Sequence, residues 1–238
     1  MLSNRAVGGA LDRIGGIQSR ILSGRTSRPA VLSGSGLKPS RAAPGMSSPM
    51  EAVRTFICLQ LPDFARDRLA SIQRRLRESG APVGWVKPHN IHLTLKFLGS
   101  VPAERLRDVV QAVQRAAVPA PSIPLELTAL GCFPNRRAPK VIWAGLKQLP
   151  EELGGLQQRV EKELVAAGFL PESRPFSPHF TLGRVRSGRN VRKLVAAMQA
   201  ERLESLRFEA AEVVVMASRL HPSGALYTPV SHIPLREK

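Results

Sequence analysis

The sequence has few cysteines and no apolar segment long enough to cross a membrane. Its 238 residues include two cysteines, Cys58 and Cys132, and each lies in an apolar run. Neither belongs to a C-x-x-C pair or to a cysteine–histidine cluster, which argues against structural zinc and against a disulfide framework. Two buried free thiols are typical of a reducing compartment, so we expect a cytoplasmic protein. Because no run approaches the roughly 18 apolar residues that span a bilayer, no membrane partner is expected.

Residues 1–50 lack aromatic residues altogether and contain a single acid, Asp12. They are rich in serine and glycine. Such a composition does not bury enough apolar surface to offset its ordering entropy, so one interpretation is a disordered basic tail. A mis-assigned start is another, since Met46 and Met50 lie just before the first strand-like segment, and a targeting segment is a third. The remaining residues, 51–238, have the size of a single domain.

The charge is positive in both parts of the chain. The sequence carries 35 lysines and arginines against 18 acidic residues, a net charge of +17. Residues 1–50 contribute +6, from seven basic residues and one acid, and residues 51–238 contribute +11, from 28 basic and 17 acidic residues. A basic folded domain favours an anionic partner, with nucleic acid or a nucleotide first. An arginine-rich surface that is merely solvated fits the charge equally well.

The segment 91–99, IHLTLKFLG, reads as a strand with two different faces. With the strand period of two, His92, Thr94 and Lys96 share one face, and the apolar residues between them, Phe97 included, share the other. The second face is a core face. The first carries an imidazole, a hydroxyl and an ammonium group in a row, which taken alone is compatible with a structural histidine.

A second copy of the H-x-T-x pattern changes that interpretation. Residues 179–182 read HFTL, so His179 and Thr181 share one face of another predicted strand. The chain contains five histidines, and two of them stand in the same pattern. The repeated pattern therefore predicts one site built from both strands.

The rest of the chain alternates helices and strands around these two motifs. We expect helices at about residues 63–79, 102–117, 151–167 and 190–200, and further strands at about 54–61, 83–86, 125–130, 140–146, 206–220 and 225–233. Each motif strand follows one helix and precedes another. This order predicts an α+β fold with two pseudo-symmetric lobes, largely antiparallel sheets and outer helices that flank a central cleft. The two motif strands are expected to lie side by side in that cleft.

Two histidines that face one cleft suit general acid–base catalysis near neutral pH, with one imidazole neutral and the other protonated. Hydrolysis of a cyclic phosphodiester needs both, because water attacks phosphorus on one side while an alkoxide leaves on the other. The hydroxyls of Thr94 and Thr181 are suited to bind the phosphate oxygens without adding a titrating group. The sequence has no H-E-x-x-H motif, no acidic cluster beside either motif and no Walker-type loop. Neither a metal nor another cofactor is therefore expected.

The two motifs stand in the contexts PHNIHLTLKFLG and SPHFTLGR, and together with RTFICLQLP and KVIWAGL they resemble the 2H phosphoesterase superfamily. The match is best to its RNA 2′,3′-cyclic phosphodiesterase branch, the LigT-like proteins once called 2′-5′ RNA ligases, over about residues 53–235. The resemblance implies a bilobal α+β fold and metal-independent opening of a 2′,3′-cyclic phosphate to a 2′-phosphate. By position it implies that His92 is the general acid for the leaving 3′ oxygen and His179 the general base for water. It also implies that Thr94 and Thr181 hold the phosphate.

The family often has a basic residue shortly after the second motif, and Arg184 occupies that place. The resemblance therefore implies that Arg184 binds the phosphate together with Thr94 and Thr181. Strict alternation puts Arg184 on the face opposite His179, so it reaches the cleft only where the strand ends or twists at Gly183. Phe133 and Phe176 lie in segments near the expected cleft, where an aromatic ring is able to stack on a base.

The expected partner is an RNA or oligonucleotide end that carries a 2′,3′-cyclic phosphate, and the expected state is a monomer. Two other functions fit the same sequence. One is a module that binds RNA or nucleotide ends without turnover, although binding alone does not require two imidazoles. The other is ATP-independent 2′-5′ RNA ligation, which is the reverse reaction on the same site.

Overall fold

The computed structural model describes residues 52–222 and 224–236. The expectations about residues 1–50 lie outside this part of the chain. Nine strands of the described residues form one sheet. They are β1 (Ala52–Gln60), β2 (Val83–Trp85), β3 (His92–Pro102), β4 (Ile123–Phe133), β5 (Val141–Leu146), β6 (His179–Val185), β7 (Leu206–Ala210), β8 (Glu212–Arg219) and β9 (Leu226–Pro234).

The sheet consists of two halves that meet at the two motif strands. Its order is β7-β4-β5-β6-β3-β1-β8-β9, with β2 paired to β6, and all pairings between these strands are antiparallel. We call β3, β1, β8 and β9 the first half-sheet, and β6, β5, β4 and β7 the second. The two halves are joined at β3 and β6 through the pair Leu93 and Phe180. The α+β fold with antiparallel sheets and adjacent motif strands is thus confirmed.

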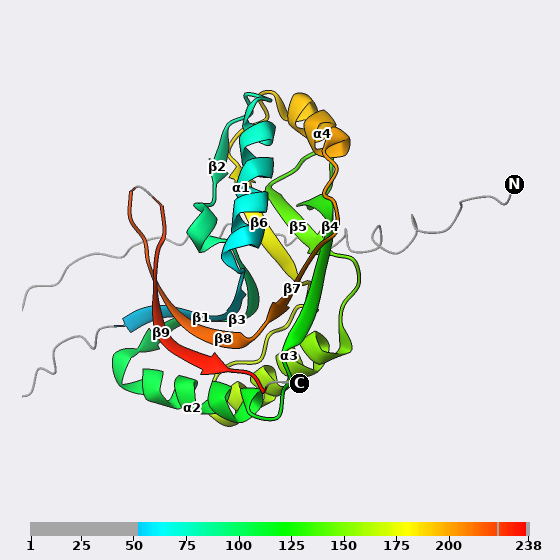
Figure 1. Ribbon diagram of the computed structural model, residues 1–238. Helices are drawn as coiled ribbons and strands as arrows, with labels where there is room; N and C mark the ends of the chain where they lie inside the picture. Colours follow the sequence, from blue (N-terminus) through cyan, green and yellow to red (C-terminus); the bar gives the residue numbers. More distant parts are fainter. Residues whose placement is uncertain (1–51, 223, 237–238) are drawn as a thin grey trace, which may run out of the picture. The chain divides into compact units, whose positions relative to one another are not determined.

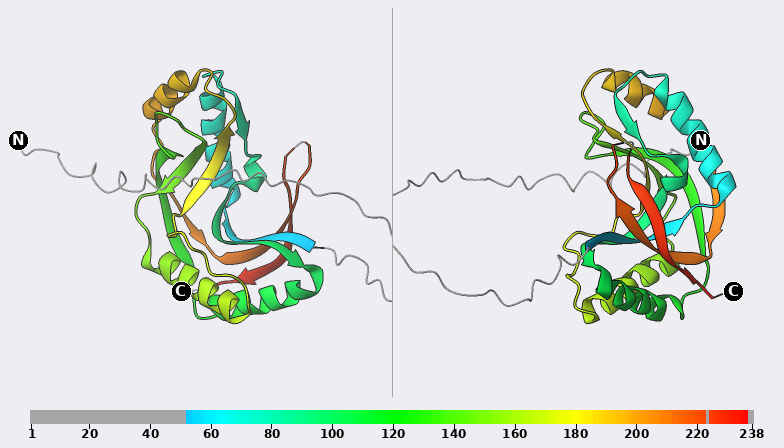
Figure 2. Two further views of the ribbon diagram at one scale, coloured as in Figure 1. Left: turned by 180° about the vertical axis from the view of Figure 1, so that it is seen from behind. Right: turned by 90° about the vertical axis from the view of Figure 1, so that its left-hand side faces the viewer.

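Four α-helices of the described residues cover the outer faces of the two half-sheets (Figures 1 and 2). They are α1 (Asp63–Arg77), α2 (Leu106–Ala117), α3 (Glu151–Ala166) and α4 (Val191–Ala200), and two single-turn 3₁₀ helices, η1 (Pro88–Asn90) and η2 (Ala103–Arg105), flank β3. Helices α2 and α3 pack together against β8, β9 and β3, whereas α4 contacts β4 and α1.

Helix α1 follows β1 in the sequence but covers the other half-sheet. Its residues Leu69, Ile72 and Leu76 are fully buried at helical spacing, as expected for an amphipathic helix with one apolar stripe. The amide of Gln73 on the same helix donates hydrogen bonds of 2.8 Å to the carbonyl oxygens of Val86 and Leu182. This buried amide ties α1 to β6, one residue beyond the H-x-T core of the second motif.

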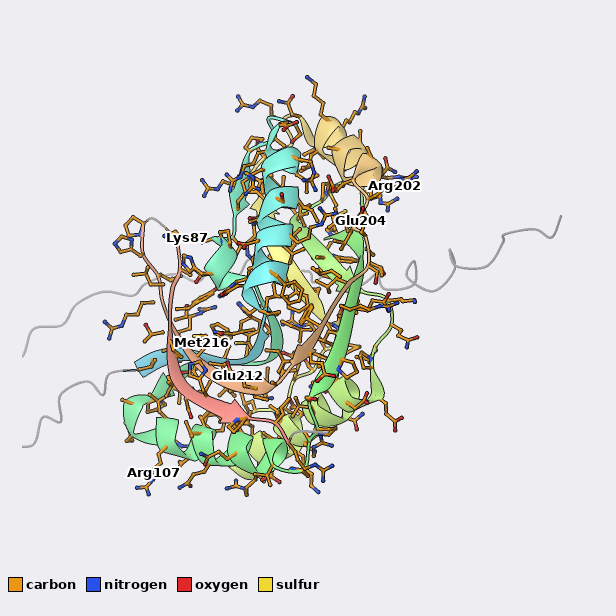
Figure 3. The ribbon with its side chains drawn as sticks, in the orientation of Figure 1. Lys87, Arg107, Arg202, Glu204, Glu212 and Met216 are labelled. Carbon is orange, nitrogen blue, oxygen red and sulfur yellow. The ribbon has the colours of Figure 1, made fainter. Side chains whose placement is uncertain are left out.

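Besides the main core, the first half-sheet has a smaller apolar cluster of its own. It contains Phe56, Cys58, Val214 and Met216, with Tyr227 packed against it. Figure 3 shows the two sides of this half-sheet: Arg107 on α2 projects outward below it, and Met216 lies along β8. Two rings of this cluster, Phe56 and Tyr227, contact the ring of His92 in the first motif.

Within residues 52–222 and 224–236, no helix is long and apolar enough to cross a membrane.

Candidate active site

The four side chains of the two motifs converge where the half-sheets meet. Leu93 of β3 pairs with Phe180 of β6. One step along this antiparallel register sets His92 opposite Thr181, and Thr94 opposite His179. The two histidines are then diagonal neighbours, for which the Cβ separation in a sheet is about 7–8 Å. All four side chains are partly exposed, while Leu93 and Phe180 between them are fully buried.

Both imidazoles are held in the same tautomer by the backbone. The Nδ1 of His92 lies 2.8 Å from the carbonyl oxygen of Asn90, and the Nδ1 of His179 lies 2.7 Å from that of Ser177. A carbonyl oxygen only accepts, so Nδ1–H is the donor in both histidines. The Nε2 atom of each ring is left for the cleft, where it accepts a proton when neutral and donates one when charged.

The two imidazoles have different aromatic neighbours. The ring of His92 stacks on Phe56 with centroids 4.7 Å apart and meets Tyr227 edge-on at 5.4 Å. The ring of His179 meets Phe133 edge-on at 5.0 Å, so Phe133 lies beside the site as expected. Because a π face attracts a cation, the stack on Phe56 favours the charged form of His92.

Burial lowers the pKa of both imidazoles below the ordinary histidine value. For His92 the burial outweighs the hydrogen bond to Asn90, which raises the pKa, and the nearby His179 lowers it further. For His179 burial is again the largest cause, and the cation of Arg184 adds to the lowering against the hydrogen bond to Ser177. The positive charge of Arg184 thus acts on His179 in particular and favours its neutral form.

Arg184 lies on the cleft side of β6 because the strand contains a bulge. Along the pairing of β6 with β5, Thr181 faces Trp143 and Gly183 faces Ile142, which leaves Leu182 as an extra residue. An extra residue inverts the alternation beyond it. Leu182 and Gly183 are consequently both buried, and Arg184 is exposed. The irregularity at Gly183, without which Arg184 faces away from His179, is therefore present, and the assignment of Arg184 to the phosphate stays a prediction.

Gly183 is required at this bulge by its neighbours. A Cβ atom built on Gly183 would come within 2.6 Å of Val83 and 3.1 Å of Trp85, both on β2. Glycine is therefore what lets β2 lie against the bulged strand. Arg184 also acts electrostatically on Tyr227, where it opposes the rise in the hydroxyl pKa that burial causes.

A matching bulge in β3 overturns the expectation for Lys96 and Phe97. Thr94 pairs with Cys58 and Lys96 with Ile57, so Leu95 is the extra residue. Lys96 consequently points into the core, where it is 4% exposed. Its Nζ donates to both carboxylate oxygens of Glu161, at 2.7 and 2.8 Å. Lys96 is therefore not on the face of His92.

Phe97, expected in the core, is 56% exposed and lies 5.8 Å from the ring of Phe56. It is the fifth residue after His92, as Arg184 is the fifth after His179. The two bulges place these residues at equivalent positions of the two motif strands. If the two copies of the motif are aligned beyond their fourth residue, Phe97 and Arg184 fall at the same position. This is the sequence signal that would have shown them to be equivalent.

Phe56 and Tyr227 are the residues of the site that sequence reasoning missed. They come from β1 and β9, far from both motifs in the sequence, and they contact His92 and each other, with 5.1 Å between their ring centroids. Phe176, in contrast, packs against the main core. Within the described residues, its ring makes no ring contact with either histidine. No local pattern marks Tyr227, although it is the single tyrosine of the chain.

The hydroxyls of Thr94 and Thr181 make no hydrogen bond with the residues that the structure describes. They are therefore available to an anion between the histidines. Among those same residues, no group of three or more histidine, cysteine or acidic side chains is arranged to hold a metal ion. Cys58, opposite Thr94 on β1, is fully buried, and burial raises the pKa of its thiol to about 12.

Comparison with known proteins agrees with this geometry. The family model for LigT like phosphoesterases matches residues 59–143 and 145–227, so each matched segment contains one H-x-T-x motif. The chain is 35% identical to an RNA 2′,3′-cyclic phosphodiesterase of Methanothermobacter thermautotrophicus, over 74% of this chain and 95% of that protein.

Two solved structures have the same fold. The protein TT0787 of Thermus thermophilus superposes with a TM-score of 0.64 and 27% identity, covering 78% of this chain and 99% of that one. E. coli LigT in its apo form superposes with a TM-score of 0.62 and 26% identity, covering 78% and 98%. With both motifs, the duplicated match and the shared fold in agreement, this chain belongs to the LigT-like phosphoesterase family.

Proposed function

We propose that this protein hydrolyses RNA 2′,3′-cyclic phosphate ends to 2′-phosphomonoesters by two-histidine acid–base catalysis without a metal. The observation that carries the proposal is the pair of histidines placed diagonally across β3 and β6, each with Nδ1 bonded to the backbone and Nε2 left for one cleft. The relatives named RNA 2′,3′-cyclic phosphodiesterase support it.

In this mechanism His179 is the base and His92 the acid. The neutral Nε2 of His179 takes a proton from water while the water oxygen forms a bond to phosphorus. The bond between phosphorus and O3′ breaks on the opposite side, and the Nε2 of protonated His92 delivers its proton to O3′. Arg184 disfavours a charged His179, which suits the base, and at His92 the ring of Phe56 favours the charged form against burial, which favours the neutral one. Proton exchange with solvent restores both rings.

The phosphate itself is held by hydroxyls and one cation. Thr94 and Thr181 donate to the non-bridging oxygens, and the guanidinium of Arg184 neutralises the charge that grows on them. The leaving oxygen belongs to the ribose and must lie next to the acid, His92. The nucleoside therefore rests on the first half-sheet, over the ring cluster that includes Phe56 and Tyr227.

The test is turnover of an oligonucleotide that ends in a 2′,3′-cyclic phosphate, with and without excess chelator. We expect a 2′-phosphate product at the same rate in both conditions. Loss of activity on chelation would contradict the metal-free mechanism. Tight binding without turnover would favour the binding module, and accumulation of 2′-5′ joined product from 5′-hydroxyl ends would favour ligation.

Arg184→Met is expected to lower kcat/KM by about 10²-fold, the usual effect of removing one preorganised donor from a developing oxyanion. Removing the cation also removes one cause of the low pKa of His179, so the acid limb of the pH–rate profile moves to higher pH. Arg186→Met is the matched control, since Arg186 is also an exposed arginine and lies two residues further on. Equal losses in the two variants would assign the effect to net charge alone.

We also propose that residues 51–238 act as one bilobal domain, in a monomer and in the cytoplasm. The monomer is supported by the site, since every residue named in the mechanism comes from one chain. The compartment is supported by Cys58 and Cys132, which are buried and unpaired, as is typical of a reducing environment.

A further inference from the structure

A groove opens beside the candidate active site, at the edge of β3. Beyond Thr94, β3 no longer pairs with β6, and the segment 168–173 that leads toward β6 lies there instead. The groove between them has a volume of about 430 Å³. We call it the edge groove, and its lining comprises Lys96, Phe97, Leu98, Gly99, Ser100, Pro102 and Arg105 on one side and residues 168–173 on the other.

The far wall of the edge groove is held in place by contacts with Lys96 of β3, Glu161 of α3 and Arg105 of η2. Besides its bonds to Glu161, Lys96 donates a hydrogen bond of 2.9 Å to the carbonyl oxygen of Leu170. The backbone amide of Glu172 donates one of 2.8 Å to the carboxylate of Glu161. The guanidinium of Arg105 lies 4.6 Å from the ring centroid of Phe169. The groove is therefore preformed, and a ligand entering it pays little ordering entropy.

The chemistry of the edge groove suits a nucleotide. Phe97 is 56% exposed and Leu170 is 87% exposed. One lies on each wall of the groove, so a flat ring that enters it contacts an apolar side chain on both sides. The guanidinium of Arg105 is already bonded to Asp108 and to the carbonyl oxygen of Ala167, so the groove offers apolar surface to a base and not a free cation to a phosphate. The carboxylate in the lining, Glu172, is paired with Arg174 at 3.4 Å. The volume also fits one such ligand, since ligand pockets begin at about 300 Å³.

The proposed mechanism gives the direction from which a longer substrate arrives. It places the terminal ribose on the His92 side, and Phe97 lies five residues further along the same strand. The side chains shorten this path, because the ring of Phe56 lies 4.7 Å from that of His92 and 5.8 Å from that of Phe97. Phe97 is therefore at the end of the groove nearest His92, and the rest of the lining, out to Arg105 and residues 168–173, is where the next nucleotide is expected. Phe97 lies between the two sites, since it contacts Phe56 and lines the groove.

We propose that the edge groove binds the base of the nucleotide that precedes the cyclic-phosphate end. The substrate is then an oligonucleotide, and a cyclic mononucleotide fills only part of the site. This inference rests on the proposed function, because the hydrolysis of the cyclic end defines which nucleotide comes next.

The experiment compares two substrates, adenosine 2′,3′-cyclic phosphate and the dinucleotide adenylyl-adenosine 2′,3′-cyclic phosphate. The readout is the ratio of their kcat/KM values. In the wild type we expect the dinucleotide to be preferred by about tenfold or more, since stacking of one base contributes this much. Leu170→Glu, which removes apolar surface and adds an anion, is expected to bring the ratio down several-fold.

Val118→Glu is the matched control, because Val118 is 70% exposed and is not part of the groove lining. It is expected to leave the ratio as in the wild type. A wild-type ratio near one, or an equal fall in both variants, would overturn the edge-groove proposal while hydrolysis stands. Absence of turnover on both substrates would instead overturn the proposed function. A dinucleotide preference that disappears only in Leu170→Glu supports the assignment.

Discussion

His179→Ala and His92→Ala are each expected to lower kcat for a cyclic-phosphate RNA end by about 10²–10⁴-fold, the usual contribution of a positioned acid or base. The reason is geometric, because each Nε2 is left for the cleft by a backbone bond at Nδ1, and the other imidazole is already occupied with the opposite proton transfer of the same step. The double variant is expected to lose little more than either single one, since the two rings act as a unit.

The pH dependence distinguishes the two roles. In the free enzyme burial holds both pKa values below the ordinary histidine value. The base must be neutral, so kcat/KM falls as the pH drops through the pKa of His179. The acid must be charged, so kcat/KM also falls as the pH rises through the lowered pKa of His92. The optimum is therefore on the acid side of pH 6.5, about the pKa of an unperturbed histidine.

Each alanine variant is expected to remove one limb of this bell. His179→Ala removes the acid limb, and His92→Ala removes the alkaline limb. His89→Ala is the matched control, because His89 is exposed in η1 only three residues before His92. The assignment would be contradicted if either catalytic variant kept a pH–rate profile with both limbs. It would also be contradicted if His89→Ala lowered kcat as much as the two catalytic variants do.

Lys96→Met is expected to lower the free energy of unfolding by about 3 kcal/mol, the cost of breaking a buried ion pair from one side. The ammonium group is almost fully buried and makes three hydrogen bonds, and Glu161 is itself only partly exposed. The variant leaves that carboxylate without its cation. Urea denaturation measures the change, and the same variant loosens the wall of the edge groove.

Lys147→Met is the control for this measurement. Its ammonium group lies 3.6 Å from Glu126 and its side chain is 57% exposed, so the expected loss is below about 1 kcal/mol. In Lys96→Met the additional change Glu161→Gln is expected to restore part of the stability, because the amide oxygen still accepts from Glu172 and the unpaired charge is gone. A loss in Lys96→Met no larger than in Lys147→Met would show that the pair is not a stabilising one.

The paired motifs and the order of elements were predictable because they depend on local patterns. His92 with Thr94 and His179 with Thr181 follow the strand period within three residues, where no irregularity intervenes. The same argument failed just beyond each motif, since a bulge adds one residue to a strand without leaving a mark in its apolar pattern. Lys96 was therefore assigned to the wrong face.

The neighbours of the histidines were not predictable from local patterns. Phe56 reaches His92 only because β1 pairs with β3, and Tyr227 only because β9 joins the same half-sheet through β8. Such pairings between distant segments are decided by the packing of the whole sheet, so they cannot be predicted from a short window of sequence.

Each half of the chain contributes helices and strands to the half-sheet that contains the motif of the other half. A chain cut in the middle therefore gives two pieces that depend on each other. Helix α1 and strand β4 from the first half cover and extend the second half-sheet, while α3 and β8 from the second half serve the first. A break in the loop 147–150, between β5 and α3, would give two pieces with one catalytic histidine each and neither half-sheet complete. Activity is then expected only when the two pieces associate. A split reporter of molecular proximity needs this property.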